Sequence, residues 1–327
     1  MVLLHILILV VGFAALIKGA DLFVDGSASL ARIFRVPAMI VGLTIVAMGT
    51  SAPELAVSTV AAIEGSNEIA FSNVVGSNIF NILMVLGVCA IVRPVPVDGR
   101  ALRKDFAVVT LPTVAVFLLM GGIRIFTGEL AGLDMESVAG TVTRPIAFAL
   151  LAVFIGYLWT LTRAARKSRR EEENDSGPER TKGRCALLIL VGAALIIAGG
   201  QAVVYGAREV ARALGMTETL IALTVVSVGT SLPELVTSLV AAKKQETDLA
   251  VGNVIGSNIF NMLMILGVSA AIRPVAVNAA SVWDLLILLV ITAVTWLFTV
   301  TGRRISRAEG ILMVLAYAGV VAFAIIR

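Results

Sequence analysis

Long, nearly uninterrupted apolar segments dominate this sequence and make the lipid bilayer its solvent. With 58% hydrophobic and 15% charged residues among 327, the chain has far more apolar side chains than one soluble core can bury. A helix crosses the hydrocarbon with about 20 largely apolar residues. The segments are continuous rather than alternating, so they predict helices and not barrel strands. The ten predicted helices span approximately residues 2–30, 36–62, 69–92, 104–122, 144–163, 184–207, 216–242, 247–272, 280–301 and 306–326.

Few residues in the sequence are suited to catalysis or to binding a transition metal. The single histidine, His5, lies near the N-terminus, which leaves no candidate for a Ser/His/Asp triad or a histidine metal cluster. Cys89 and Cys185 fall in or beside predicted helices, where a small apolar packing role is expected. The first apolar segment lacks the basic start and cleavage site of a signal peptide, which favours a retained spanning helix. We therefore expect a protein that is not an enzyme and has no cofactor.

The two halves of the chain match each other at a constant offset of 180 residues. Residues 43–60 match residues 223–240 at 11 of 18 positions, and residues 73–94 match residues 253–274 at 16 of 22 positions. Identity at this level over ungapped segments indicates an internal duplication. The predicted organisation is a first five-helix repeat at 1–163, a charged linker at 164–183 and a second five-helix repeat at 184–327.

The odd number of helices in each repeat predicts that the second repeat is inverted in the membrane. If the linker is cytoplasmic, 19 Lys and Arg residues lie in cytoplasmic loops and 6 lie on the opposite side. The positive-inside rule then predicts a multi-pass cell-membrane protein with both termini outside. Inverted repeats are a transporter architecture, with the binding site near the membrane midplane. The predicted fold class is an all-α integral membrane protein of ten transmembrane helices, arranged as two inverted-topology five-helix repeats.

Each repeat contains the same interruption of a hydrophobic helix, the pattern Gly-Thr-Ser-x-Pro-Glu at 49–54 and 229–234. Proline lacks an N–H and clashes with the carbonyl four residues back. Carbonyls near Ala47 and Thr50, and their equivalents in the second copy, are therefore expected to leave the helical hydrogen-bond ladder. Irregular backbone at membrane depth is tolerated where it lines a cavity. Taken alone, the pattern is equally well explained by a proline kink capped by Thr and Ser hydroxyls.

The glutamate after each proline, Glu54 or Glu234, favours an ion site over a simple kink. A carboxylate near the bilayer centre is costly unless it is paired or bound. Hard divalent cations prefer carboxylate and carbonyl oxygens, and calcium fits better than magnesium, which loses its water reluctantly. Transition metals would favour His or Cys ligands, which the motif lacks. We expect the two carboxylates to face each other across one pocket and to bind calcium.

The helix that follows each motif carries a polar stripe with the spacing i, i+4, i+8, which places these side chains on one helical face. Two interpretations apply. The stripe can form interhelical hydrogen bonds and small-residue packing, or it can supply neutral oxygens to monovalent cations, and both can hold together. The stripe residues are Asn73, Ser77 and Asn81 in the first repeat and Asn253, Ser257 and Asn261 in the second.

A charged cluster on the first predicted helix breaks the similarity between the repeats. Lys18, Asp21 and Asp25 share a helical face, and their equivalents in the second repeat are uncharged. We expect a local ion pair that anchors an interface. An accessory proton or cation path is the alternative.

At these motifs the chain resembles the sodium/calcium exchanger branch of the cation/calcium antiporter superfamily, and its prokaryotic ten-helix type in particular. The resemblance covers essentially the whole helical layout. Some relatives, including potassium-dependent members, have aspartate at the position of Asn261, so asparagine here argues against potassium co-transport. The resemblance implies calcium ligands at Glu54, Glu234, Thr50 and Thr230, and a sodium-binding or central polar shell made of Ala47, Ser51, Ser77, Asn81, Ser227, Ser231, Ser257 and Asn261.

The function that the resemblance implies is antiport of calcium against sodium by alternating access, with about three Na⁺ per Ca²⁺. Two alternatives remain: a proton/calcium antiporter that uses the same glutamates, and a cation channel lined by the acidic pair. Inverted repeats around a closed site favour alternating access over a pore, and the duplicated hydroxyls favour sodium over protons. The expected partners are calcium and sodium ions and the lipid bilayer, without nucleic acid, and a monomer suffices for the site.

Overall fold

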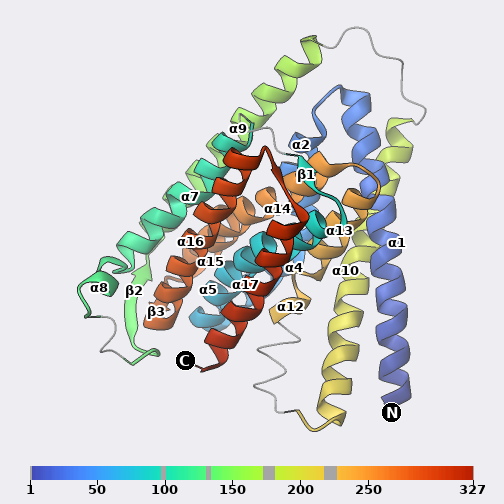
Figure 1. The fold of residues 1–327 in the computed structure, drawn as a ribbon. Coiled ribbons are helices and arrows are strands. Elements are labelled where there is room, and N and C mark those ends of the chain that lie inside the picture. Colours follow the sequence, from blue (N-terminus) through green and yellow to red (C-terminus); the bar gives the residue numbers. More distant parts are fainter. Residues whose placement is uncertain (1, 97–100, 130–133, 172–180, 217–226, 327) are drawn as a thin grey trace. The chain divides into compact units, whose positions relative to one another are not determined.

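The computed structural model describes residues 2–96, 101–129, 134–171, 181–216 and 227–326, and these ranges are mostly helical (Figure 1). Within them, seven helices are long and apolar enough to cross a membrane. A further candidate is a bent pair, Ala38–Thr50 and Ala52–Glu64, whose two parts differ in direction by 50°. The seven helices are Val2–Phe34, Ile69–Val92, Arg144–Ser168, Lys182–Ala213, Thr247–Ile272, Ala279–Gly302 and Arg307–Ile326.

Eight of the ten predicted spans therefore have a counterpart among the described residues, if the bent pair counts as one. The predicted span 104–122 corresponds to the helix α7 (Ala101–Leu119), which does not qualify as a span because its first turns carry the charged residues Arg103, Lys104 and Asp105. The predicted span 216–242 falls partly on residues 217–226, which lie outside the described ranges. The membrane-helical class is confirmed, and the full set of ten helices stays a prediction.

The chain forms two compact units, and each unit is assembled from two separate stretches of sequence. Unit 1 consists of Met1–Pro53 and Trp159–Ser257, and unit 2 consists of Glu54–Leu158 and Asn258–Arg327. Each unit thus contains residues from both halves of the duplicated sequence.

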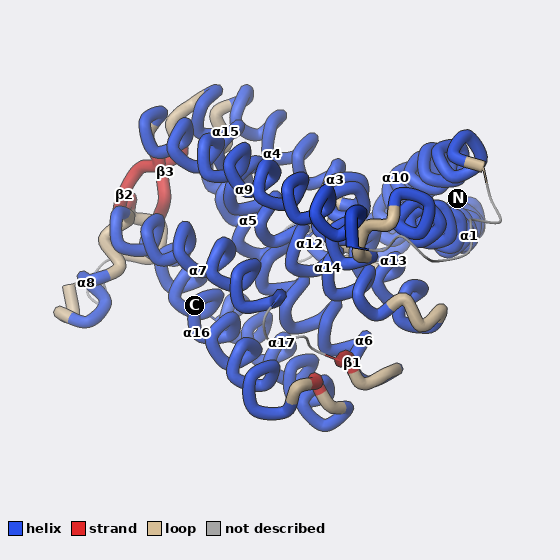
Figure 2. Tube along the Cα trace, turned by 90° about the horizontal axis from the view of Figure 1, so that it is seen from above, coloured by secondary structure: helices blue, strands red, loops and turns tan. Residues whose placement is uncertain are grey.

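Unit 1 contains two long helices that lie side by side (Figures 1 and 2), together with shorter elements. They are α1 (Val2–Phe34) and α10 (Lys182–Ala213). The shorter elements are α2 (Ala38–Val41), the π-helical segment η1 (Gly42–Val46), α3 (Ala47–Thr50), α12 (Ser227–Gly229), α13 (Leu232–Lys243) and most of α14 (Thr247–Ile259).

Glycines allow α1 and α10 to approach at backbone distance. A Cβ added at Gly19 would lie 2.8 Å from the backbone nitrogen of Ile196, and one added at Gly12 would lie 2.9 Å from that of Val203. In a bilayer, helices associate through such close packing of small residues, since lipid tails already solvate larger apolar side chains.

Unit 2 contains the remaining helices and two small antiparallel sheets. Strand β1 (Val95–Pro96) pairs with β4 (Arg304–Ile305), and β2 (Val138–Val142) pairs with β3 (Val275–Asn278). The helical elements are most of α4 (Ala52–Glu64), α5 (Asn67–Phe80), the π-helical segment η2 (Asn81–Val85), α6 (Leu86–Val92), α7, α8 (Ile123–Phe126), part of α9 (Arg144–Glu171), the π-helical segment η5 (Phe260–Ile265), α15 (Leu266–Ile272), α16 (Ala279–Gly302) and α17 (Arg307–Ile326).

The two spans that carry the polar stripes are buried to a much larger fraction than the other spans. The spans Ile69–Val92 and Thr247–Ile272 each have 78% of their apolar window buried, whereas the other five have 11 to 28% buried. Large apolar side chains such as Leu3 and Leu190 are exposed, as expected where lipid replaces water. The two polar stripes therefore lie on the most deeply buried helices.

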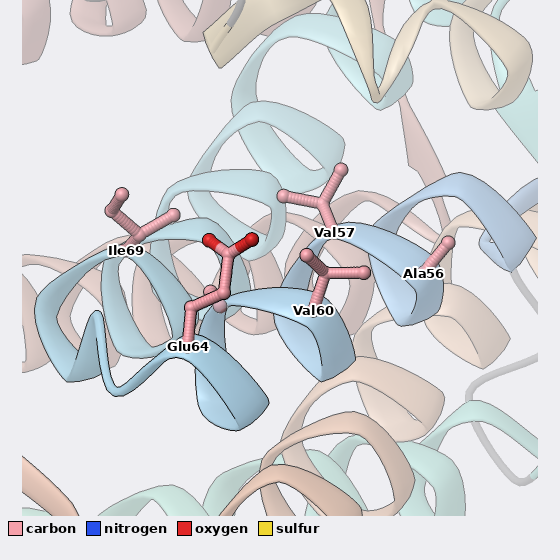
Figure 3. A pocket seen from close by; sticks show the side chains of 6 residues that line it. Ala56, Val57, Val60, Glu64 and Ile69 are labelled. Atoms are coloured by element: carbon pink, nitrogen blue, oxygen red, sulfur yellow. The ribbon is translucent and has the colours of Figure 1, made fainter.

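A shallow groove of about 350 Å³ lies on the outer face of α4 in unit 2 (Figure 3). Its lining is apolar apart from one carboxylate, and Val60 and Ile69 at its edge are exposed. Such a lining suits lipid and offers one charged group, so the groove is a poor candidate for a cation site. The lining residues are Ala56, Val57, Val60, Ala61, Glu64 and Ile69.

Candidate functional site

The first Gly-Thr-Ser-x-Pro-Glu motif forms the bend between α3 and α4. Helix α3 ends at Thr50, Ser51 has φ −85° and ψ 11°, and α4 begins at Ala52. Pro53 therefore occupies the first turn of the new helix, where its missing N–H costs no hydrogen bond. The predicted break is confirmed, but it falls before the proline.

The expectation that the Ala47 carbonyl leaves the ladder is wrong. That carbonyl accepts the backbone N–H of Ser51 at 3.0 Å. The reason is that the helix continues through Thr50, and only after Ser51 does the chain change direction. The Ala47 carbonyl is thus hydrogen-bonded in this structure.

The second motif repeats this geometry. Helix α12 ends at Gly229, Thr230 and Ser231 form a turn, and α13 begins at Leu232 with Pro233 in its first turn. The backbone N–H of Ser231 donates to the carbonyl of Val228 at 3.2 Å. Both copies therefore place their glutamate in the first turn of a helix, where the positive end of the helix dipole favours a negative charge.

The carboxylate of Glu234 is completely buried and is held by hydroxyl groups. Its Oε1 atom accepts the Ser51 hydroxyl at 2.6 Å and the Ser257 hydroxyl at 3.4 Å. Its Oε2 atom has no hydrogen-bond partner among the described residues. A buried carboxylate oxygen without a donor is costly, and a bound cation would remove that cost.

Asn253 connects the Glu234 helix to the first motif. Its Nδ2 group donates to the Ser238 hydroxyl at 2.9 Å and to the Glu234 carbonyl at 3.5 Å, while its Oδ1 atom accepts the Thr50 hydroxyl at 3.0 Å. Residues from both sequence halves thus meet within unit 1. Asn253 therefore fixes the first turn of α13 against α3.

Glu54 in unit 2 has the same local support. Its side chain is completely buried. Asn73 donates from Nδ2 to the Glu54 carbonyl at 3.3 Å and to the Ser58 hydroxyl at 2.8 Å. These contacts match those of Asn253 at the offset of 180 residues, so each glutamate-bearing helix is fixed by an asparagine from the polar stripe.

Three asparagines in unit 2, Asn78, Asn258 and Asn261, form a second polar cluster. Asn78 and Asn258 each donate from Nδ2 to the carbonyl of the other, at 3.3 and 3.4 Å. Asn261 donates from Nδ2 to the Oδ1 atom of Asn78 at 3.1 Å. Asn81 and Asn261 are fully buried. Asn81 and Asn261 belong to the predicted polar stripe, whereas Asn78 and Asn258 lie one helical position away from it and were not predicted.

Both repeats contain a π-helical segment at this cluster, which sequence reasoning did not predict. The backbone N–H of Leu86 donates to the carbonyl of Asn81, and that of Leu266 donates to the carbonyl of Asn261, five residues back in each case. Short π-helical segments inside α-helices occur frequently at functional sites. No single residue type in these segments signals a wider turn.

The remaining predicted site residues lie in or beside the same segments. Ser77 and Ser231 are buried, and Thr230 is half-buried in the turn before α13. The backbone of Ser227 begins α12, but its side chain lies outside the described residues. Within the described part of the chain, no group of three or more His, Cys, Asp or Glu side chains gathers as a metal site, so neutral oxygens would have to complete any cation shell.

The predicted ion pair on α1 is confirmed, and it has a partner that the sequence analysis missed. Lys18 contacts Asp21 at 3.0 Å, and the ammonium of Lys244, just after α13, contacts Asp21 at 2.5 Å and Asp25 at 2.6 Å. Burial lowers the pKa of Lys244, but the hydrogen bonds to Asp21 and Asp25 outweigh burial, so the pKa is raised. Arg32 also contacts Glu246 at 3.2 Å. These ion pairs therefore join separate elements of unit 1 through residues other than the buried Glu234.

Deeply buried carboxylates and carboxamides in a protein with seven membrane-length apolar helices are the features of a multi-span membrane transport protein. Comparison with known proteins agrees. The family described as "Sodium/calcium exchanger protein" matches residues 4–163 and 185–326, and the chain belongs to this family.

Individual relatives match over nearly their whole length. The protein CaxA of Alkalimonas amylolytica is 36% identical over 313 residues, which cover 94% of this chain and 95% of CaxA. The sodium/calcium exchanger MaX1 of Methanosarcina acetivorans is 32% identical, with 97% of each chain covered. The solved structure of the sodium-calcium exchanger NCX_Mj soaked with 2.5 mM Na⁺ and 10 mM Sr²⁺ matches with a TM-score of 0.80 and 30% identity, and covers 98% of this chain and 99% of that one.

Proposed function

We propose that this chain is a secondary antiporter that exchanges Ca²⁺ for Na⁺ across a cell membrane by alternating access. The observation that carries the proposal is the buried Glu234 carboxylate, which is held through Oε1 by Ser51 and Ser257 while Oε2 has no partner among the described residues. Membership of the sodium/calcium exchanger family and the similarity to MaX1 and NCX_Mj support it.

The proposed calcium ligands are Glu54 and Glu234, because one Ca²⁺ carries the charge that two carboxylates neutralise together. Thr50 and Thr230 add neutral oxygens, which a hard cation accepts readily. The proposed sodium-binding or central polar shell contains Ala47, Ser51, Ser77, Asn81, Ser227, Ser231, Ser257 and Asn261. For Ala47 the contribution would be its carbonyl, which accepts the backbone N–H of Ser51 in this structure.

The proposed architecture is ten transmembrane helices in two inverted repeats, 1–163 and 184–327, joined by a cytoplasmic linker at 164–183 with both termini outside. The sequence duplication and the distribution of Lys and Arg support this arrangement. A monomer contains both glutamates and is sufficient for this mechanism.

The test is calcium uptake into proteoliposomes that contain the purified protein. Uptake should follow an outward sodium gradient, and an outward proton gradient of equal size should not replace it. If the proton gradient drives uptake equally well in the absence of sodium, the protein is a proton/calcium antiporter that uses the same carboxylates. Calcium flux that needs no counter-ion and never accumulates against a gradient would indicate a channel.

A further inference from the structure

The buried asparagines of unit 2 are symmetric in sequence, but their hydrogen bonds are asymmetric. Asn78 and Asn258 are equivalent at the offset of 180 residues, as are Asn81 and Asn261. All four side chains are at most 1% exposed. Any difference between the two pairs therefore comes from the way the helices are placed and not from the residue types.

Hydrogen-bonding rules fix the orientation of the Asn78 carboxamide. A backbone carbonyl only accepts, so the atom of Asn78 that lies 3.3 Å from the Asn258 carbonyl must be Nδ2. The Oδ1 atom then lies on the other branch and needs a donor. That donor is Nδ2 of Asn261, at 3.1 Å.

The same rule orients Asn261. Because its Nδ2 group is directed at Asn78, its Oδ1 atom lies on the opposite branch, where it is buried and has no hydrogen-bond partner among the described residues. A carboxamide binds a cation only through its oxygen, since the NH₂ group carries positive partial charge. Asn261 is therefore held with the cation-binding atom directed away from Asn78.

The equivalent pair, Asn258 and Asn81, lacks the hydrogen bond between side chains that joins Asn78 to Asn261. Asn258 also donates to a backbone carbonyl, that of Asn78 at 3.4 Å, so its orientation is fixed in the same way. Its Oδ1 atom nevertheless has no partner among the described residues, and neither do Nδ2 and Oδ1 of Asn81. Asn81 therefore lacks the contact that determines which end of its carboxamide points toward the site.

We propose that Asn78 is a positioning residue that holds Asn261 with its side-chain oxygen available to the transported cation, while Asn258 leaves Asn81 free to turn. The inference rests on the proposed function, in which Asn81 and Asn261 belong to the cation shell. It assigns unequal roles to two residues that the sequence makes equivalent. The side-chain oxygen of Asn261 is oriented for the cation before binding, whereas the Asn81 carboxamide must be oriented when the ion binds.

Matched substitutions test this assignment. Asn78→Ala and Asn258→Ala each remove one hydrogen bond to a backbone carbonyl, of nearly equal length, but only Asn78→Ala removes the acceptor of Asn261. Asn78→Ala should raise the KM for Na⁺ or Ca²⁺ about fivefold more than Asn258→Ala does, the factor that corresponds to one buried neutral hydrogen bond. Equal effects of the two variants would overturn the proposal.

A double-mutant cycle separates positioning from general weakening of the fold. In the Asn261→Ala background, Asn78→Ala and Asn258→Ala should have the same effect on cation affinity, because there is no longer a carboxamide to orient. If the difference between them persists, it does not pass through Asn261 and the proposal fails. Asn261→Ala alone reports on the proposed function: if it changes neither the Na⁺ nor the Ca²⁺ affinity, Asn261 is not in the cation shell.

A second variant keeps the proposal testable if Asn78→Ala does not fold. Asn78→Asp retains an oxygen that can accept the Asn261 amide, but it loses the donor to the Asn258 carbonyl, so its matched reference is Asn258→Asp, which loses the equivalent donor and adds the same charge. Calcium affinity measured by titration calorimetry on the purified proteins should be equal in the two Asp variants, in contrast to the two Ala variants. A lower affinity in correctly folded Asn78→Asp than in Asn258→Asp would overturn the positioning role.

Discussion

Replacing Glu234 by glutamine should abolish calcium transport while leaving the fold intact. Glutamine keeps the shape of the side chain and retains an oxygen that can accept the hydroxyls of Ser51 and Ser257. What it removes is one negative charge in a completely buried position. The protein should therefore still fold, whereas its affinity for a divalent cation should fall.

The magnitude follows from the distance between a calcium ion and its carboxylate ligand. At about 2.4 Å and an effective dielectric constant of about 20, one carboxylate charge interacts with the two positive charges of Ca²⁺ at about 14 kcal/mol. If the lower desolvation cost of a neutral side chain offsets about three quarters of this, about 3.5 kcal/mol is lost, which corresponds to about a 300-fold weaker calcium affinity.

The assay is titration of purified wild type and Glu234→Gln with calcium, followed by sodium-driven calcium uptake in proteoliposomes. The matched control is Glu64→Gln, because Glu64 lies at the surface groove of α4 (Figure 3) and should leave affinity within about twofold. Glu54→Gln should behave like Glu234→Gln. Calcium affinity within tenfold of wild type in a folded Glu234→Gln protein would refute the assignment of this carboxylate as a ligand.

Three further predictions concern the dependence of exchange on potassium, its dependence on voltage, and the ion pairs that Lys244 forms in unit 1. Calcium exchange should not depend on potassium, because position 261 carries asparagine rather than aspartate; exchange that stops when potassium is withdrawn from both sides would contradict this reading. With about three Na⁺ per Ca²⁺, each cycle should move one net charge, so a change of 100 mV should alter the calcium gradient at equilibrium about 40-fold; flux in voltage-clamped liposomes that ignores the potential would exclude this stoichiometry. Lys244→Met should destabilise the protein by about 1 kcal/mol relative to the neighbouring control Lys243→Met, because Lys244 contacts Asp21 and Asp25 at partly exposed positions. Thermal unfolding at low and high salt measures this, and a difference that does not shrink with salt would point to packing rather than charge.

Much of the candidate site was accessible from the sequence because apolar surroundings make polar residues conspicuous. Glu54 and Glu234 stand out since a carboxylate within a membrane helix needs a partner, and the structure buries both completely. The bend at Ser51 was likewise expected from the proline. The expectation for the Ala47 carbonyl failed because proline at the start of a helix removes no hydrogen bond, so the preceding helix ends in regular fashion.

Contacts between distant segments were not accessible from the sequence. Lys244 forms ion pairs with Asp21 and Asp25, which lie more than 200 residues away in the sequence. No local sequence pattern identifies Lys244 as their partner. Asn253 reaches Thr50 in the same way. Such pairs depend on which helix faces which, and helices in lipid associate through packing of small residues that many arrangements can satisfy.

By itself, the sequence determined that this protein is a helical membrane protein with a duplicated core and buried acids, because hydrophobic length, repeat offset and the cost of a buried charge are properties of the chain alone. The tertiary structure decided how equivalent residues differ. Asn78 and Asn258 are the same residue at matching positions, yet only Asn78 accepts a hydrogen bond from its neighbouring asparagine. A hydrogen bond depends on a few tenths of an ångström between helices, and a duplicated sequence fixes which groups are present but not whether each copy brings them within reach.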